Sequence, residues 1–93
     1  MKIEFDPVKN QRNIAERNIS FESVIDFDWA NALIWQDCRF DYGEPRFNAL
    51  SYLNNRVHFL TFKPLTNGIR VISFRKANKR EVKHYENQQH RTS

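Results

Sequence analysis

The residue types best suited to chemistry on a phosphate gather toward the C-terminal end of the sequence. Guanidinium and ammonium groups bind phosphate oxygens, and a carboxylate, an imidazole or a phenol can accept or donate a proton. Residues 70–85 supply all of these groups within a short span, as a metal-free set for cleaving RNA would require. The alternative is a solvated basic helix that caps a sheet. The residues concerned are Arg70, Arg75, Lys76, Arg80, Glu81, His84 and Tyr85.

The order of apolar and polar residues predicts a strand, a turn and a helix around these groups. Ile69–Phe74 is short and rich in β-branched residues, which is typical of a buried strand. Asn78 is a good N-cap, and Glu81 stands three residues later, at the spacing of a capping box. We therefore expect a helix from about Asn78 to Asn87. Arg75 then lies where the strand ends and the helix is about to begin.

The rest of the chain predicts an α+β fold with the order β-α-α-β-β-β-β-α. Four consecutive strands with short links imply an antiparallel meander sheet, and the helices at the two ends of the chain are expected to pack on it. Residues 88–93 are polar and are expected to be frayed. The other expected strands are Met1–Phe5, Ala32–Asp37, Arg46–Leu53 and Arg56–Lys63, and the other expected helices are Asp6–Arg17, with Val8, Ile14 and Ala15 on its apolar face, and Ser20–Phe27, with Phe21, Val24, Ile25 and Phe27 pointing inward.

Length and composition favour one domain, residues 1–93, in a reducing compartment. The lone cysteine, Cys38, excludes an internal disulfide. No apolar run approaches the ~20 residues needed to span a bilayer. The first ten residues also lack the apolar stretch of a signal peptide. We therefore expect a cytoplasmic protein that does not contact a membrane.

Charge is divided unevenly along the chain. Residues 1–44 hold nine acids and five bases, whereas residues 45–93 hold two acids and ten bases. The first part is therefore −4 and the second +8, in agreement with the net charge of +4. Such asymmetry predicts one side that faces a polyanion and a more acidic side elsewhere.

Several kinds of site are excluded by what the sequence lacks. It has no P-loop and no glycine-rich dinucleotide fingerprint, and two glycines could hardly build either one. Its three histidines, His58, His84 and His90, do not have the spacing of a zinc site, and no paired-aspartate metal motif occurs. We expect no cofactor, so a nuclease built on this chain would be metal-independent.

Three segments, in order and at matching spacing, carry a family resemblance over nearly the whole chain. The N-terminal segment contributes Phe5-Asp6-Pro7, Lys9, Asn13, Ile14 and Ile19-Ser20-Phe21-Glu22. The middle segment contributes Asp41-Tyr42-Gly43-Glu44, Arg46 and Ala49. The C-terminal segment contributes Arg70, Ile72-Ser73, Arg75, Ala77, Arg80-Glu81 and Tyr85. Together these residues resemble the BrnT family of bacterial type II toxins.

The resemblance implies a RelE-like fold and a ribonuclease that halts translation by acting on RNA, either free or on the ribosome. It also implies neutralisation by a BrnA-type antitoxin, through which alone the toxin would meet DNA. The sequence departs from the family pattern in two places. Glu16-Arg17-Asn18 stands where Lys-His-Gly is common, and Ser51 replaces a glycine. The first change weakens any case for a catalytic base on the first helix.

Cleavage by attack of the ribose 2′-hydroxyl requires a base, a cation at the phosphate and an acid. Arg75 and Arg70 are the expected phosphate and transition-state binders, because a guanidinium fits those oxygens in a bidentate manner. Glu81 is the first candidate base, with Tyr85 or His58 as the second. Glu81 could instead be a helix cap or an ion-pair partner that holds an arginine in place. The expected RNA-binding residues are Lys76, Lys79, Arg80, Lys9 and Arg46.

Two other classes of function remain open at this stage. The same bases could hold phosphate in a non-catalytic RNA-binding module. The chain could also be a partner-binding module without RNA chemistry.

Overall fold

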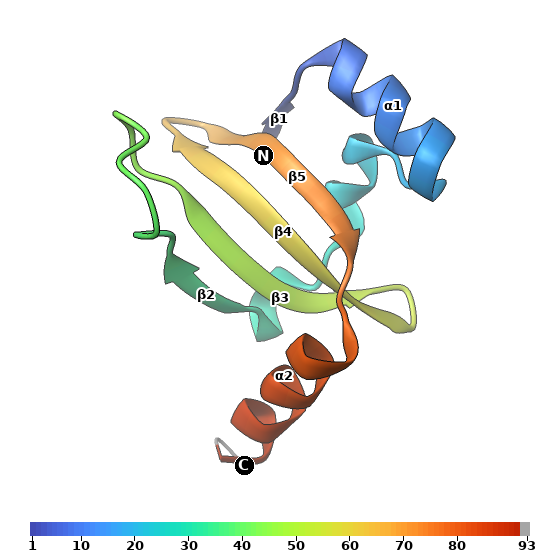
Figure 1. The fold of residues 1–93 in the computed structure, drawn as a ribbon, viewed down its shortest axis with the longest axis vertical. Coiled ribbons are helices and arrows are strands. Elements are labelled where there is room, and N and C mark those ends of the chain that lie inside the picture. The colour runs from blue at the N-terminus through green and yellow to red at the C-terminus, as the bar shows by residue number, and fades with distance from the viewer. Residues whose placement is uncertain (92–93) are drawn as a thin grey trace.

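One five-stranded sheet forms the centre of the structure, a computed structural model that describes residues 1–91, with side chains described to Gln89. Its strand order is β1-β5-β4-β3-β2 (Figure 1). The strands are β1 (Lys2–Glu4), β2 (Leu33–Gln36), β3 (Phe47–Leu53), β4 (Arg56–Leu65) and β5 (Gly68–Lys76). The helices are α1 (Pro7–Arg17), the short 3-10 helices η1 (Phe21–Asp26) and η2 (Trp29–Asn31), and α2 (Lys79–Arg91).

The expected α+β class is confirmed, but a purely antiparallel sheet is wrong. Strands β2 to β5 form the expected antiparallel meander. Strand β1, however, pairs in parallel with β5, from Lys2 opposite Gly68 to Glu4 opposite Arg70. A Cβ at Gly68 would overlap the backbone carbonyl of Lys2, so the glycine permits this close approach. The sheet is therefore mixed.

A bulge in β5 decides which side chains face which side of the sheet. Thr61 lies opposite Ser73, whereas the next residue of β4, Phe62, lies opposite Val71. Ile72 is thus the extra residue on β5. Because of this insertion, Val71 and Phe74 both point to the buried face of the sheet. Ser73 and Arg75 point to the other face.

The main core covers the first face of the sheet beneath η1. Phe21, Val24 and Phe27 are buried there at a spacing of three residues, which aligns side chains on a 3-10 helix. The expected α-helix over Ser20–Phe27 is therefore wrong in type, and Ile25 is exposed rather than buried. The remaining members of this cluster are Ile19, Ala49, Leu53, Leu60, Phe62, Ile69, Val71 and Phe74.

Helix α1 is attached beside this core mainly by amides. The side chain of Asn13 donates to the carbonyls of Ile19 (2.9 Å) and Phe74 (3.0 Å), and the amide oxygen of Asn10 accepts from the Phe21 N–H (2.8 Å). Asp6 caps the helix, since its side chain accepts from the N–H of Val8 at 2.9 Å. Val8, in contrast, is 67% exposed and Ala15 is also exposed, so the expected apolar face of this helix is wrong except at the half-buried Ile14.

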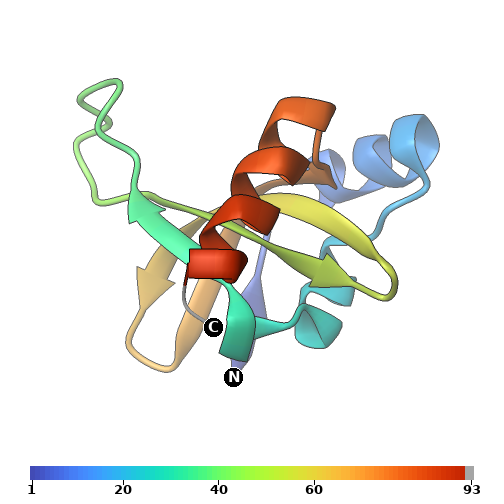
Figure 2. The same ribbon diagram turned by 90° about the horizontal axis from the view of Figure 1, so that it is seen from below.

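Helix α2 lies on the second face of the sheet, opposite η1 (Figure 2). It covers a smaller cluster made of Leu50, Val57, Ala77 and Tyr85. The helix continues to Arg91, past the expected end at Asn87. The expectation that the chain is frayed from residue 88 is therefore wrong for residues 88–91. The rest of that expectation lies outside the described residues. Because α2 covers one end of the sheet only, the remainder of the second face stays open.

Other boundaries differ by a few residues. Strand β4 extends through Pro64 and Leu65, where a turn was expected, and β5 extends through Arg75 and Lys76. Strand β2 is shorter than expected at both ends. No helix within the described part of the chain has the length and hydropathy that crossing a membrane would require.

Val71→Asp should prevent folding, because Val71 is 2% exposed within the main core. An uncompensated buried charge costs roughly 3–5 kcal/mol, which is a large part of the stability of a small domain. Soluble yield and urea unfolding measure the effect. Val8→Asp is the matched control, since it places the same charge on the surface of α1. Soluble Val71→Asp protein with the wild-type urea midpoint would show that β5 is wrongly placed.

Candidate functional site on the open face of the sheet

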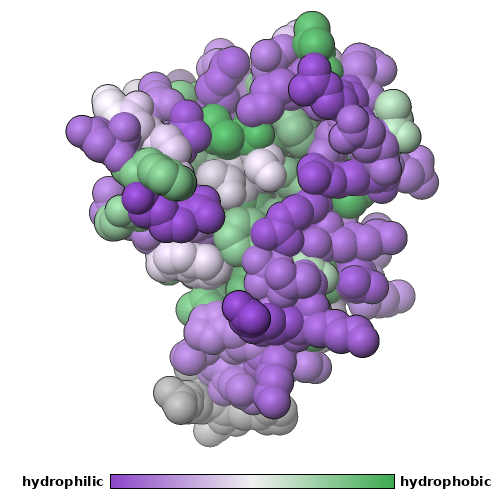
Figure 3. Space-filling model, in the orientation of Figure 1, coloured by the Kyte–Doolittle hydropathy of each residue, from purple (hydrophilic) through white to green (hydrophobic). Residues whose placement is uncertain are grey.

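A groove of about 470 Å³ occupies the part of the second face that α2 leaves open. Its floor comes from β2 to β5, one end is formed by the start of α2, and the other by the loop of residues 37–46. Figure 3 shows apolar surface in the middle of this face, with hydrophilic surface around it. The lining includes three arginines, two acids and three aromatic rings, namely Arg39, Arg46, Arg75, Asp37, Glu81, Trp35, Tyr42 and Phe59.

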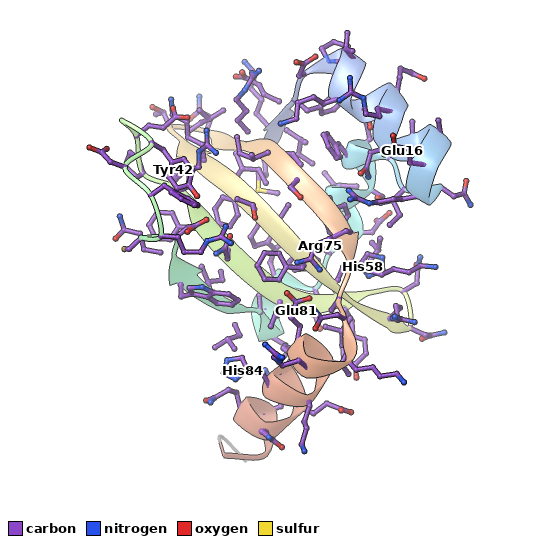
Figure 4. All side chains as sticks on the ribbon, viewed as in Figure 1. Glu16, Tyr42, His58, Arg75, Glu81 and His84 are labelled. Carbon is purple, nitrogen blue, oxygen red and sulfur yellow. The ribbon has the colours of Figure 1, made fainter. Side chains whose placement is uncertain are left out.

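Arg75 and Glu81 meet at the end of this groove where β5 leads into α2 (Figure 4). Their contact is bidentate: Nη1 donates to Oε1 at 2.8 Å and Nη2 to Oε2 at 3.0 Å. Glu81 Oε1 also accepts from the N–H of Asn78 (2.9 Å), while the Asn78 side chain accepts from the N–H of Glu81 (2.8 Å). The expected capping box is therefore present, and its carboxylate also orients the arginine.

The guanidinium of Arg75 keeps the donors of a second edge available. Its Nη1 and Nη2 atoms serve Glu81, and Nη1 also approaches the Lys76 carbonyl at 3.3 Å. Among the described residues, neither Nε–H nor the remaining Nη2–H has a partner. These two N–H groups form the other bidentate edge of a guanidinium. The guanidinium also stacks over the Phe59 ring, 4.5 Å from the ring centroid, and this contact fixes the plane of the guanidinium.

The loop between β2 and β3 brings a second arginine to the groove. Arg46 lies over the Tyr42 ring at 4.1 Å and contacts Glu44 at 3.6 Å. Glu44 makes its shorter contact, 2.7 Å, with Lys63. The Nε of Arg46 is buried and has no hydrogen-bond partner among the described residues. Arg46 is thus positioned by an aromatic ring and is only weakly neutralised.

Asp37 and Arg39 form the rim of the groove beside that loop. The buried Asp37 carboxylate accepts from Arg39 Nε (2.9 Å) and Nη2 (2.8 Å), and Tyr42 approaches it at 3.3 Å. The hydrogen bond from Arg39 holds the pKa of Asp37 far below its ordinary range. Asp37 is therefore a poor proton acceptor, and its role here is to anchor the loop.

Glu81 is ionised at neutral pH for a similar reason. The hydrogen bond from Arg75 lowers its pKa from the ordinary value, and the N–H of Asn78 acts in the same direction. A carboxylate that is so strongly stabilised is a weak base. The geometry of Glu81 directly supports a role in positioning Arg75. A role as a base requires that the hydrogen bonds from Arg75 to Glu81 weaken when a phosphate binds.

The structure separates the other expected catalytic residues from this pair. Arg70 lies on the same face but farther along β5, where it contacts Glu4 at 3.5 Å. Tyr85 is 2% exposed on the side of α2 that packs against the sheet, and its hydroxyl donates to the Asn31 carbonyl at 2.9 Å. His58 is buried on the opposite face, since it pairs with Lys76 whereas its neighbour Phe59 pairs with Arg75. Only Arg75 and Glu81 of the catalytic set share the groove.

The expected RNA-binding residues are also divided. Arg46 lines the groove. Lys79 and Arg80 are exposed on the first turn of α2 but do not line the groove, and Lys76 is exposed at the end of β5 on the other face. Lys9 is exposed on α1, away from the groove. His84 is exposed on α2 and does not line the groove (Figure 4).

Sequence reasoning missed the residues that build the floor and rim. Trp35 and Phe59 pack edge to face, with ring centroids 5.7 Å apart, although they come from different strands. The alternation of Arg56–Lys63 already placed Phe59 and Thr61 together on one face, and that signal could have been followed. The pairing of Asp37 with Arg39 depends on the path of a loop, for which the sequence carries no comparable signal.

The donor atoms of the groove suit an anion better than a metal ion. No group of three or more His, Cys, Asp or Glu residues that could hold a metal occurs within the described residues. The acids of the groove are each held by an arginine, while Arg75 and Arg46 retain free donors. This arrangement can bind a phosphate and stabilise charge that develops on it.

The comparison with protein families agrees with this chemistry. The family model described as ribonuclease toxin, BrnT, of type II toxin-antitoxin system matches residues 5–81. No curated protein matches the chain.

Proposed function

Since the chain belongs to the BrnT family of ribonuclease toxins from type II toxin–antitoxin systems, we propose that it cleaves RNA in the groove beside Arg75 without a metal ion. Family membership makes RNA the substrate and an antitoxin the partner. The proposal adds the place of cleavage, the residues and the metal independence. We also propose that cleavage inhibits translation and that the antitoxin is of the BrnA type. The RelE-like architecture that the resemblance implies stays a prediction.

The observation that carries the proposal is the geometry of Arg75. Glu81 holds one bidentate edge of the guanidinium, and the edge formed by Nε–H and Nη2–H remains for a phosphate. An arginine already fixed in orientation loses little conformational freedom when it binds. Arg46 lines the same groove, so a second guanidinium is available to the negatively charged backbone.

The proposed reaction is an internal transfer. The ribose 2′-oxygen attacks the adjacent phosphorus, its proton passes to a base, and the bond from phosphorus to the 5′-oxygen breaks as that oxygen is protonated. The products are a 2′,3′-cyclic phosphate and a 5′-hydroxyl. Arg75 contacts the phosphate oxygens and stabilises their added charge in the transition state. Glu81 positions Arg75 and is the first candidate for the base.

The aromatic rings of the groove fit single-stranded RNA. Trp35 is 36% exposed, and its ring lies beside Phe59 on the floor. Unpaired bases stack on such rings, and arginines between the rings follow the backbone. A non-catalytic RNA-binding module would use the same surface, and the cleavage assay below separates the two functions.

Arg75→Ala should abolish cleavage and toxicity while the protein stays folded. Arg75 is part-exposed at a strand end, and the loss of one transition-state donor costs on the order of 3–4 kcal/mol, or about 10²–10³ in rate. Cleavage of RNA is measured in excess EDTA, and growth is followed after induction of the chain without its antitoxin. Thermal unfolding confirms that the variant is folded.

Arg12→Ala is the matched control, because Arg12 is exposed on α1, away from the groove. It should remain toxic and active. Full activity of folded Arg75→Ala protein would remove Arg75 from the site. Loss of wild-type cleavage in EDTA would instead overturn metal independence.

Glu81→Gln separates a base from a positioning residue. The glutamine keeps an oxygen that can accept from Asn78 and Arg75, but it cannot take a proton at neutral pH. A base role predicts a fall in kcat of about 10²–10⁴ with KM little changed. A positioning role predicts a much smaller fall for Glu81→Gln than for Glu81→Ala, with KM raised in the latter.

The antitoxin is expected to cover the basic corner made of Arg75, Lys76, Arg80 and the start of α2. Lys76, Lys79 and Arg80 are exposed and form no ion pair within the described residues, so an acidic partner surface gains attraction there. RNA and antitoxin should then compete, and the association rate should fall as salt rises, since screening acts over roughly 8 Å at physiological ionic strength. An antitoxin complex with undiminished RNA affinity would contradict the covering arrangement.

A further inference from the structure

A second hollow, of about 500 Å³, lies on the opposite side of the sheet from the groove. It is bounded by the C-terminal end of α1, the start of η1, the β3–β4 hairpin and the end of β5. Its lining contains two arginines, one lysine and one histidine, but no carboxylate. These four residues are Arg17, Arg56, Lys76 and His58. Hydroxyl and amide side chains from Asn18, Ser20, Ser23, Asn54 and Asn55 fill most of the remaining wall.

The cations of this hollow are oriented but not neutralised. Arg17 donates to the amide oxygen of Asn13 at 2.9 Å, and Asn13 is itself buried and bonded to two backbone carbonyls. Arg56 is directed by a 3.3 Å contact with the Ala77 carbonyl. None of the three cations forms an ion pair with any residue that the structure describes. The hollow therefore differs from the groove, where each acid is matched with a base.

His58 forms the buried side of the hollow. Its Nδ1 lies 2.8 Å from the Arg56 carbonyl, and its ring is tilted against Phe74 at 5.4 Å between centroids. Burial lowers its pKa, and the nearby charges of Arg56 and Lys76 act in the same direction. An anion bound in the hollow would oppose those two charges and favour the protonated ring.

The hollow and the groove meet at the end of β5. Arg75 and Lys76 are consecutive, and their partners on β4, Phe59 and His58, are consecutive too, so each pair faces an opposite side of the sheet. Strand β1 pairs only with Gly68–Arg70, so it does not cover this end of β5. A flexible polyanion can thus pass from Arg75 around the strand end to Lys76. In Figure 4, Arg75 and His58 lie on either side of this end of the strand.

We propose that this hollow binds a backbone phosphate of the RNA substrate, next to the segment held in the groove. The inference rests on the proposed function for the identity of the polyanion. Phosphate is the chemistry that fits three unpaired cations surrounded by hydroxyl and amide groups. An acidic peptide fits less well, because the wall offers little apolar surface beyond Ile19 and Leu53 to anchor its side chains.

The first experiment tests for a phosphate site without RNA or cleavage. The pKa of His58 is followed by NMR while inorganic phosphate is added to the whole chain. We expect phosphate to raise the pKa of His58 and to leave the NMR signals of His84, exposed on α2, unchanged. The effect should be lost in the double variant Arg17→Gln, Lys76→Gln. An unchanged His58, or an equal change at His84, would overturn the phosphate site.

The second experiment tests whether the phosphate belongs to RNA. Binding is measured with 2′-O-methyl RNA, which lacks the attacking hydroxyl, as a dinucleotide and as a strand long enough to pass the end of β5. The double variant should bind the long strand about 10-fold more weakly and lower its salt slope by about 1.4, given roughly 0.7 for each phosphate contact. Dinucleotide binding should not change.

Arg12→Gln, Lys83→Gln is the matched control, since it removes the same charge from exposed positions outside the hollow. It should affect both RNA lengths equally and only slightly. Equal losses for the two double variants would overturn the RNA assignment even if phosphate still moves His58. If the wild-type chain binds no RNA while phosphate raises the His58 pKa, the proposed function fails and the phosphate site stands alone.

Discussion

The carboxylate of Glu81 is the point on which the C-terminal half of the structure depends. It closes the first turn of α2 through Asn78 and holds Arg75 at the end of β5. The helix it begins is the one that covers Leu50, Val57 and Tyr85. One side chain therefore links the cover of the second core cluster to the orientation of the guanidinium.

Charge is arranged differently on the two sides of the sheet. In the groove, the carboxylates of Asp37 and Glu81 each accept two hydrogen bonds from an arginine, which fixes that guanidinium and leaves its other donors free. In the hollow, buried amides and carbonyls do the orienting, so the positive charge itself is kept. The arrangement in the groove favours a ligand whose geometry matches the fixed guanidinium groups. The arrangement in the hollow favours attraction of an anion at longer range. The net charge of +4 thus understates how concentrated the positive potential is.

The sequence predicted well those features that depend on residues close to one another. The capping box at Asn78 and Glu81, the caps of α1 and the antiparallel meander all follow from local spacing. The parallel pairing of β1 does not, because it joins residues 2–4 to residues 68–70. Tyr85 was misleading for the same reason: its place on α2 was expected, but its burial against β3 depends on how the helix crosses the sheet. The floor of the groove combines side chains from separate strands, and only the fold brings them together.

The parallel pairing of β1 also determines when the sheet can be completed during synthesis of the chain. The first strand has no partner until Gly68–Arg70 has left the ribosome, and Arg75 and Glu81 follow later still. Contacts between distant parts of a chain form slowly, because a long loop must close before they stabilise anything. The groove is likewise completed late, because its lining includes Ile72, Arg75 and Glu81 from β5 and α2. If the groove is where RNA is cut, as proposed, residues up to Glu81 must be made before any RNA, including the message itself, can be cut.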